Sequence, residues 1–265
     1  MKILVCIKQV PATNEVEMDE KTGVLKRDQA SAKINPYDLY ALELAFTLRE
    51  EHGGEITAIT MGPPQAKSAL QEALQMGADR GVLICDRRFA GADVVATSRT
   101  LAEGIRKNGL FDLILCGKQT TDGDTGQVGP ELAEFLDISH ASYVQSVSAD
   151  SSGVIVEVNL GETFVIQKMS YPCLLTVEKD INTPRLPSWR RTLAIRDDAI
   201  AVYSLDDFKN QNEKLYGLSG SPTQVERIFP PEKNTKREMI RGSAEETAGK
   251  MFSILSEGKN LPNCE

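Results

Sequence analysis

The sequence predicts an α/β fold in which a parallel sheet is covered by helices on both faces. Short apolar runs alternate four times with segments whose apolar residues recur at three- and four-residue spacing, which is typical of strands followed by crossover helices. Tight loops rich in glycine or proline follow the strands. The 265 residues are 41% hydrophobic and 26% charged, an ordinary composition for a soluble globular protein. We therefore expect right-handed crossovers that bring several strand ends to one edge of the sheet.

The expected strands of the parallel sheet are short apolar runs of the kind that is buried on both faces. In chain order they cover 2–7, 56–60, 81–85, 113–116, 173–177 and 199–203. The first helix begins at Asn35 and Pro36, because asparagine is a favoured cap residue and proline suits the first helical turn. Helices are expected over 36–52, from about 66 to 77, over 94–107 and from Pro130 onward.

The rest of the chain predicts additions to this core. Alternating segments joined by turn residues predict an antiparallel extension of the sheet over 143–148, 154–160 and 163–168. A small hairpin is expected within 16–27, and a long exposed loop without periodicity over 178–198. We expect a nucleotide-binding α/β domain over 1–204 and an extended C-terminal arm over 205–265, which ends in a helix at 243–257.

Charge and composition exclude several classes of function. The net charge of −8 argues against a nucleic-acid-binding protein. No apolar run approaches the ~20 residues of a membrane span, and the five-residue apolar run at the N-terminus is too short for a signal peptide. The five cysteines lack a C-x-x-C pair, and two histidines make a zinc site unexpected. We expect a cytoplasmic protein without a bound metal.

The chain is organised around residues 111–136, a strand followed by a glycine-rich loop and a helix that starts near Pro130. This arrangement presents backbone N–H groups and the positive end of a helix dipole to a phosphate group. Gly123 and Gly126 would let a ligand approach the main chain closely. A glycine loop can also be only a tight turn, and this one matches neither standard nucleotide motif. Asp122 and Asp124 would cap amides or accept hydrogen bonds from ribose or adenine.

Four stretches resemble the electron transfer flavoprotein beta subunit: KILVCIKQV at 2–10, INPYDLYALE at 34–43, the loop at 117–132 and NTPR at 182–185. The resemblance implies an α/β core related to the adenine-nucleotide alpha hydrolases. It also implies a heterodimer with a homologous alpha subunit that carries one FAD. In this family the beta subunit holds a second adenine nucleotide, which is a structural AMP in the widespread type and FAD in the electron-bifurcating type.

Two segments resemble the bifurcating type. The loop over 122–130 lacks the consecutive acids and the Asn-Gln-Thr-Gly run that are usual with AMP, and DRRFAGADVVATS at 86–98 is a pattern that AMP-binding relatives lack. The resemblance then implies an oxidoreductase subunit that takes a hydride from NADH. One electron passes to ferredoxin or flavodoxin, and the other passes through the alpha-subunit FAD to an acyl-CoA dehydrogenase-type or other flavin dehydrogenase. Since the flavin performs the chemistry, no catalytic acid, base or nucleophile is expected.

Two alternatives stay open on the sequence. One is a conventional beta subunit with AMP. The other is an ATP-consuming enzyme of the same architecture, for which Asp122 and Asp124 alone make a weak metal site.

The resemblance implies cofactor contacts at three places. The AMP portion and pyrophosphate would contact Gly117, Lys118, Gln119, Thr120, Thr121, Asp122, Gly123, Asp124, Thr125, Gly126, Gln127 and Val128. The adenine and ribose side would be lined by Cys6, Asn35, Pro36, Tyr37, Asp38, Met61, Gly62 and Pro63. The isoalloxazine would lie toward Phe89, Ala90, Gly91, Asp93 and Thr97. From the residues alone, Cys6 and Phe89 could equally be core residues.

The resemblance also implies two surfaces for protein partners. A partner dehydrogenase would dock on the loop that contains Arg185, Leu186, Trp189, Arg190 and Arg191, with the single tryptophan as its anchor. A tryptophan in such a loop could instead fold back onto the core. The arm over 205–265 is expected to pack on the alpha subunit, because its periodic apolar content is too small for an independent domain.

Overall fold

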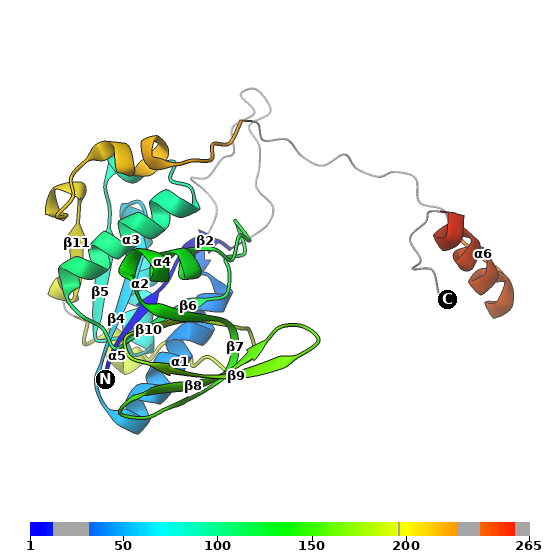
Figure 1. The fold of residues 1–265 in the computed structure, drawn as a ribbon, viewed down its shortest axis with the longest axis horizontal. Helices are drawn as coiled ribbons and strands as arrows, with labels where there is room; N and C mark the ends of the chain where they lie inside the picture. The colour runs from blue at the N-terminus through cyan, green and yellow to red at the C-terminus, as the bar shows by residue number, and fades with distance from the viewer. Residues whose placement is uncertain (13–31, 196, 227–238, 258–265) are drawn as a thin grey trace. The chain divides into compact units, whose positions relative to one another are not determined.

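The computed structural model describes residues 1–12, 32–195, 197–226 and 239–257. The chain forms two compact units, Met1–Gln224 and Val225–Glu265. The first unit is an α/β structure built on one nine-stranded sheet (Figure 1). The predicted fold class is confirmed.

The strands of the sheet lie in the order β11-β5-β4-β1-β6-β10-β7-β8-β9. Their bounds are β1 Lys2–Cys6, β4 Glu55–Met61, β5 Arg80–Ile84, β6 Leu113–Gly117, β7 Ser139–Ala149, β8 Gly153–Asn159, β9 Phe164–Ser170, β10 Cys173–Val177 and β11 Ile200–Tyr203. Pairing is parallel from β11 to β7 and antiparallel through β7, β8 and β9. The expected antiparallel extension therefore continues the parallel sheet at one side.

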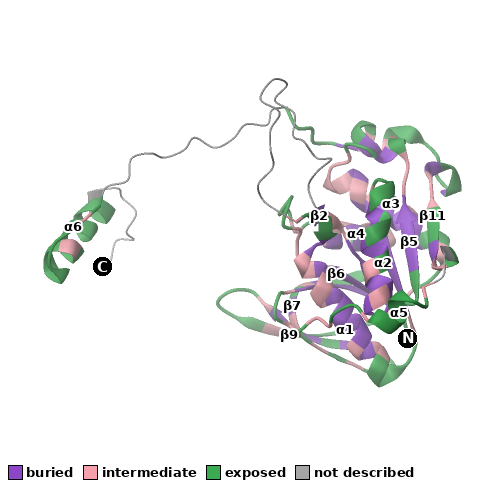
Figure 2. Cartoon of the chain, turned by 180° about the vertical axis from the view of Figure 1, so that it is seen from behind, coloured by how far each residue is buried: buried purple, intermediate pink, exposed green. Residues whose placement is uncertain are grey.

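Two hydrophobic cores lie on opposite faces of the sheet. Helices α1 (Pro36–His52) and α2 (Lys67–Met76) cover one face, and α3 (Val94–Asn108) and α4 (Val128–Leu136) cover the other. Side chains along β1 alternate between these cores: Ile3 and Val5 pack with the first pair of helices, and Leu4 and Cys6 with the second. Because both faces are covered, the central strands are buried almost completely, as Figure 2 shows.

Smaller elements follow the strands or flank the undescribed residues. Strands β2 (Gln9–Pro11) and β3 (Ala32–Ile34) pair antiparallel, and the hairpin predicted within 16–27 lies outside the described residues. The short 3₁₀ turns η2 (Pro64–Ala66) and η3 (Arg87–Phe89) follow β4 and β5.

The expectation of a loop without secondary structure over 178–198 is wrong in part, because a helical turn, α5 (Trp189–Thr192), lies within it and a 3₁₀ turn, η4 (Asp197–Ala199), begins at its end. The Ser188 N–H donates to the Gln75 carbonyl at 3.0 Å, so this turn is attached to the end of α2.

The segment that follows β11 packs on the α3 side of the sheet. It contains the 3₁₀ turns η5 (Leu205–Asp207), η6 (Glu213–Leu215) and η7 (Gly217–Gly220). Leu205, Phe208 and Tyr216 are buried in the same core as α3. The compact unit thus extends 20 residues past the predicted boundary at 204, and the contact of the arm with an alpha subunit stays a prediction.

In the second unit, the predicted terminal helix is confirmed as α6, Ala244–Glu257. Ser243 and Glu246 cap its first turn reciprocally, as a capping box does. The larger apolar side chains of α6 are all exposed: Met251, Phe252, Ile254 and Leu255. Within the described ranges, no helix has both the length and the apolar character needed to cross a membrane.

Close packing of α4 on the sheet depends on Gly129. A Cβ atom at this position would overlap Cγ2 of Thr176, which is buried on β10. We expect Gly129→Ala to lower the free energy of unfolding by about 1–3 kcal/mol, since overlap with a stiff β-branched side chain outweighs the gain in helix propensity of at most ~1 kcal/mol. Chemical denaturation of the purified complex would measure the difference.

A double variant provides the control. Thr176→Ser removes the overlapping methyl group but keeps the hydroxyl, which accepts the Tyr143 N–H at 3.3 Å. Gly129→Ala with Thr176→Ser should therefore be more stable than the sum of the two single changes. Strict additivity of the two single effects would contradict this account.

Candidate nucleotide site

The carboxyl ends of β5, β4, β1 and β6 lie side by side at one edge of the sheet. Backbone bonds tie each strand end to its neighbour: Gly62 N–H donates to Ile84 O at 3.0 Å, and Ile7 N–H donates to Ile59 O at 2.9 Å. Lys118 N–H continues the row by donating to Val177 O at 2.9 Å. The predicted meeting of several strand ends at one edge is therefore confirmed, with the ends at Cys6, Met61 and Gly117 among them.

Asn35 joins the glycine loop to the start of α1. It is fully buried, and its Nδ2 donates to Asp38 Oδ1 at 2.8 Å and to the Gln119 carbonyl at 2.9 Å. Its Oδ1 accepts the Thr121 N–H at 3.2 Å. The predicted helix start is confirmed, but the predicted capping by the Asn35 side chain is wrong, because that side chain makes no cap hydrogen bond. Pro36 and Tyr37, both half-buried, form the first turn of α1 beside it.

Asp38 lies beneath this junction, only 4% exposed. Its Oδ2 accepts the Lys8 N–H at 2.7 Å, so the carboxyl group connects the end of β1 to α1. Burial raises the pKa of Asp38 to about 7. Hydrogen bonds from Asn35 and Lys8 favour the ionised form and partly oppose this rise. Gly117 is required here, since a Cβ atom would overlap both Asp38 and the Tyr37 backbone.

The acidic residues of the glycine loop have partners within the chain. Lys8 Nζ contacts both carboxylate oxygens of Asp122 at 2.8 Å, and the Gln119 amide donates to Asp124. Burial alone would raise the pKa of Asp122, but hydrogen bonds from Lys8 and Thr120 lower it. Asp122 therefore pairs with a side chain, which the sequence interpretation had not considered.

Two loop residues, Asp124 and Gly126, have a positive φ, 54° and 65°. A Cβ atom at Gly126 would come no closer than 3.6 Å to Lys118 O, so the chain itself leaves space there. From Thr121 to Thr125 the loop is largely exposed, and α4 begins at Val128 with its N–H groups directed toward the loop.

Lys118 lies within the loop, but its ammonium group points to another partner. Nζ donates to Glu178 Oε1 at 2.8 Å and lies 5.1 Å from the centre of the Tyr143 ring. The hydrogen bond with Glu178 raises the pKa of Lys118. Its side chain thus has an intramolecular ion pair, and the predicted phosphate or main-chain contact of Lys118 with the nucleotide stays a prediction.

A cavity of about 520 Å³ lies where β4 and β5 end. Met61, Gly62 and Pro63 of the predicted adenine side and Phe89, Ala90 and Gly91 of the predicted isoalloxazine side line it. The other predicted residues of these two groups lie outside the lining: Cys6, Asn35, Pro36, Tyr37, Asp38, Asp93 and Thr97. Its lining is Met61, Gly62, Pro63, Pro64, Gln65, Ile84, Cys85, Asp86, Arg87, Phe89, Ala90, Gly91 and Ala92. Phe89 is 4% exposed and stacks on Phe208 at 5.5 Å between ring centres, so most of its side chain packs in the core.

Asp93 and Thr97 belong to the start of α3. Asp93 Oδ1 accepts the Ala96 N–H at 3.0 Å as a helix cap, and its Oδ2 accepts the Thr223 N–H at 2.9 Å. Burial would raise the pKa of Asp93, but these hydrogen bonds lower it. Thr97 is half-buried in the first turn, where its N–H donates to the Asp93 carbonyl at 2.9 Å.

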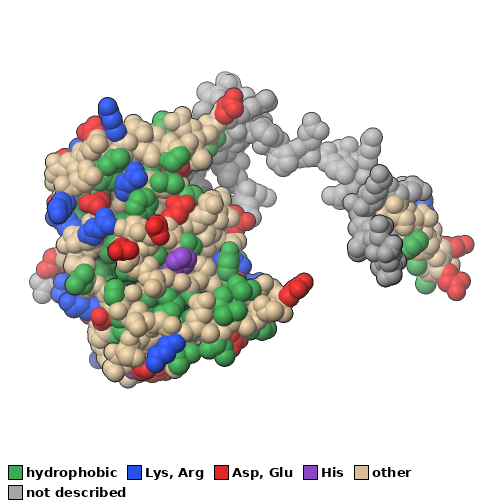
Figure 3. Space-filling view, viewed as in Figure 1, with side chains coloured by type: hydrophobic (Ala, Val, Ile, Leu, Met, Phe, Trp, Pro, Cys, Tyr) green, Lys and Arg blue, Asp and Glu red, His purple; other side chains and the backbone are tan. Residues whose placement is uncertain are grey.

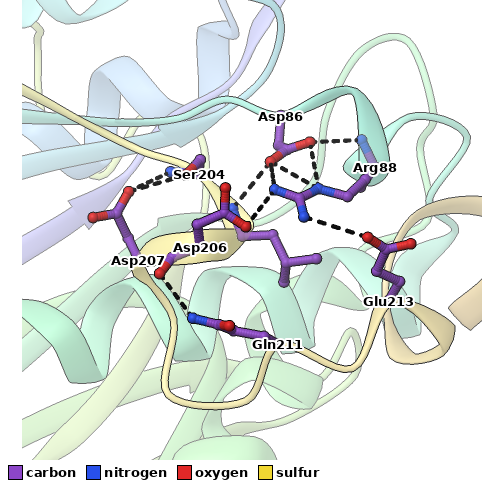
Figure 4. Close-up of polar contacts among 8 residues, drawn as sticks. Asp86, Arg88, Ser204, Asp206, Asp207, Gln211 and Glu213 are labelled. Atoms are coloured by element: carbon purple, nitrogen blue, oxygen red, sulfur yellow. Dashed lines mark hydrogen bonds and ion pairs between the residues drawn. The ribbon is translucent and has the colours of Figure 1, made fainter.

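A polar cluster that the sequence interpretation missed holds the cavity loop to the segment after β11 (Figure 4). The Arg88 guanidinium contacts Asp86 at 2.6 Å, Asp206 at 2.9 Å and Glu213 at 3.3 Å. Asp86 Oδ2 also accepts the Leu205 N–H at 3.1 Å. Hydrogen bonds from Arg88 hold the pKa of Asp86 well below its usual range. No sequence signal marked this cluster, since Asp206 and Glu213 lie 118 and 125 residues from Arg88.

Of the predicted docking residues, Arg185 is held against α1 and the others are exposed. Arg185 binds α1, with its guanidinium 2.9 Å from Glu43, 2.7 Å from Glu50 and 4.9 Å from the centre of the Phe46 ring. Leu186 and Trp189 are 86% and 76% exposed. Leu193, which was not predicted, adds a third exposed apolar side chain, and Arg190 and Arg191 are exposed beside them.

Other exposed surface is mixed. Figure 3 shows acidic and basic side chains interspersed among hydrophobic ones over the face that carries α3 and α4. Phe164 and Ile166 on the edge strand β9 are exposed as well.

Comparisons with known proteins agree on one family. The model of the electron transfer flavoprotein domain matches residues 22–204. The chain is 42% identical, over 97% of its length and 98% of the relative, to the electron transfer flavoprotein subunit beta of Clostridium acetobutylicum. It is equally similar, over the same shares, to subunit CarD of the caffeyl-CoA reductase–Etf complex of Acetobacterium woodii. Protein FixA of Azorhizobium caulinodans is 40% identical over 87% of this chain and 85% of its own.

The family model spans the glycine loop and the cavity lining, and the first two relatives cover 97% of the chain. The comparisons agree with the resemblance of the four sequence stretches. The chain belongs to the electron transfer flavoprotein family, as a relative of its beta subunits.

Proposed function

We propose that this chain is the FAD-binding beta subunit of a cytoplasmic, NADH-oxidising and electron-bifurcating electron transfer flavoprotein. The observation that carries the proposal is the length of the candidate site. The glycine loop follows β6, the cavity lies at the ends of β4 and β5, and β1 lies between β4 and β6. Three strand spacings separate β5 from β6, or ~14 Å. A mononucleotide at the glycine loop leaves the cavity unexplained, whereas a dinucleotide accounts for both.

Phosphate binding would depend on the main chain. Lys8 is paired with Asp122 and Lys118 with Glu178, so the two lysines near the loop already have carboxylate partners. The loop N–H groups and the N-terminus of α4 remain as donors for an anion. Gly123 and Gly126 leave open space beside the backbone, which suits close approach of a pyrophosphate.

At the other end, the cavity wall suits a flat aromatic ring. Its lining is mostly apolar, with Met61, Pro63 and Ile84 among the contributing side chains. When bound, FAD supplies the redox chemistry. The protein contributes by orienting the ring against this wall, excluding water from one side and holding the loop with the Arg88 cluster. Pro36, Tyr37 and Asp38 would lie at the adenine and ribose part of the same edge.

The proposed partners follow from the family. An alpha subunit with its own FAD would complete the heterodimer and contact the arm, where the exposed apolar side chains of α6 offer a surface. Ferredoxin or flavodoxin would accept one electron. A flavin dehydrogenase, such as an acyl-CoA dehydrogenase-type enzyme, would accept the other and dock on the Trp189 loop. The name of the CarD relative places that protein in a complex with a CoA-ester reductase.

The first expected result concerns cofactor content. The purified alpha–beta complex should release two FAD per heterodimer and no stoichiometric AMP, and NADH should bleach its flavin absorbance under anaerobic conditions. Extraction followed by chromatography separates the two nucleotides. One FAD with one AMP would instead identify a conventional beta subunit.

A variant at Gly126 tests the loop. Gly126→Asn should fold, because asparagine tolerates positive φ and no atom of the chain lies closer than 3.6 Å to the new Cβ. It should nevertheless lower the nucleotide content of the beta subunit, since its side chain enters the space left for the ligand. Gly161→Asn is the matched control: its φ is 91° and nothing lies within 4 Å of a Cβ there. Equal nucleotide content in both variants would argue against this loop as the site.

A variant at Trp189 tests partner docking. Because Trp189 is 76% exposed, Trp189→Ala should leave the melting temperature and flavin content almost unchanged. Loss of an interface anchor should weaken binding of the acceptor dehydrogenase by ~2–4 kcal/mol, roughly thirty- to thousand-fold. Leu110→Ala, at a residue that is 90% exposed elsewhere on the unit, serves as the control. Titration of the dehydrogenase against each variant gives the affinities, and an unchanged affinity for Trp189→Ala would rule out this anchor.

A further inference from the structure

We propose that Arg87 binds the diphosphate of the dinucleotide that donates hydride at the cavity, and so acts as a specificity residue for an anionic donor. This inference rests on the proposed function, in which a dihydronicotinamide dinucleotide reduces a flavin held at this edge of the sheet. It assigns the donor's charged portion to one side chain of this chain.

Two neighbouring arginines in η3 have opposite surroundings. Arg88 is half-buried, and its guanidinium is shared among the carboxylates of Asp86, Asp206 and Glu213. Arg87 is exposed and lines the cavity, and among the residues that the structure describes its guanidinium has no hydrogen-bonding or ionic partner. Arg88 therefore holds the loop in place, while Arg87 remains available for a ligand.

The charges around the cavity leave Arg87 uncompensated. Asp86 and Arg87 are the two charged residues of the lining described above. Asp86 is neutralised by Arg88, which contacts it at 2.6 Å, and hydrogen bonds keep Asp86 ionised and engaged with this partner. Arg87 is thus the one cation of the lining, and its guanidinium is not engaged by the carboxylates that Arg88 holds. An anionic ligand in the cavity could therefore pair with Arg87 directly.

The shape of the cavity agrees with a ligand that is part ring and part anion. Apolar groups from Met61, Pro63, Pro64 and Ile84 form one wall, which suits the planar nicotinamide and flavin rings. The guanidinium of an arginine matches phosphate oxygens with two parallel N–H donors, so it binds a diphosphate with defined geometry. A donor bound at Arg87 would be oriented as well as attracted.

The test compares two hydride donors that differ in charge. Anaerobic stopped-flow reduction of the flavin in the purified alpha–beta complex would use NADH and 1-benzyl-1,4-dihydronicotinamide, which has no phosphate. For Arg87→Gln we expect the NADH concentration at half-maximal rate to rise about ten- to hundred-fold, as for loss of a charge-assisted hydrogen bond. The maximal rate with NADH, the rate with the phosphate-free donor and the FAD content should stay unchanged. Arg87→Lys should recover part of the NADH affinity.

Control variants separate this role from others. Lys67→Gln removes a positive charge from an exposed residue two positions after Gln65 of the lining. It should leave the rate of flavin reduction and its concentration dependence unchanged with both donors. Unchanged NADH dependence in Arg87→Gln would overturn the inference and leave the proposed function intact. Slower reduction by both donors, or loss of FAD, would also overturn it, since Arg87 would then serve the flavin or the fold. A wild-type complex that NADH does not reduce would overturn the proposed function and this inference together.

Discussion

The buried amide of Asn35 is the contact on which the candidate site depends. Both Nδ2 hydrogens and Oδ1 are used, on Asp38, Gln119 O and the Thr121 N–H. Asp38 in turn accepts the Lys8 N–H, so one pair of side chains joins the end of β1, the start of α1 and the glycine loop. A buried polar group that loses its partner costs about 1–3 kcal/mol, which favours a single loop conformation. The loop amides are therefore oriented before any phosphate arrives.

At the other end of the same sheet edge, an arginine joins separate segments as Asn35 does at the glycine loop, but it does so through ion pairs. Arg88 joins Asp86, at the end of β5, to Asp206 and Glu213 in the segment after β11. Phe89, Phe208 and Tyr216 pack against one another beneath these ion pairs, with ring centres 5.5–6.0 Å apart. The segment beyond residue 204 thus supports the cavity wall without lining the cavity. In both places most charged side chains form ion pairs within the chain. The backbone amides and Arg87 therefore remain available to bind an anion.

The elements of the sheet could be predicted because their signals are local. Apolar runs, the Asn35-Pro36 helix start and the glycines after strands give the strands and helices to within one or two residues, except for β7, which begins before its predicted run. The side-chain partners could not be predicted in the same way. Asn35 meets Gln119, 84 residues away, and Arg185 meets Glu43, 142 residues away. Lys118 illustrates the limit: its position inside the loop favoured a phosphate or main-chain contact, and nothing in the sequence indicated its ion pair with Glu178, which follows β10.

Helix α1 connects the two functional regions proposed for the chain. Asn35 and Asp38 at its start hold the glycine loop, while Glu43, Phe46 and Glu50 farther along it hold Arg185 and hence the loop that exposes Trp189. A helix of 17 residues is ~25 Å long and stiff. Because the contacts at both places are made to the same helix, the exposed surface around Trp189 is held at a fixed separation from the nucleotide loop. A partner that docks there would meet the cofactor edge in a defined orientation.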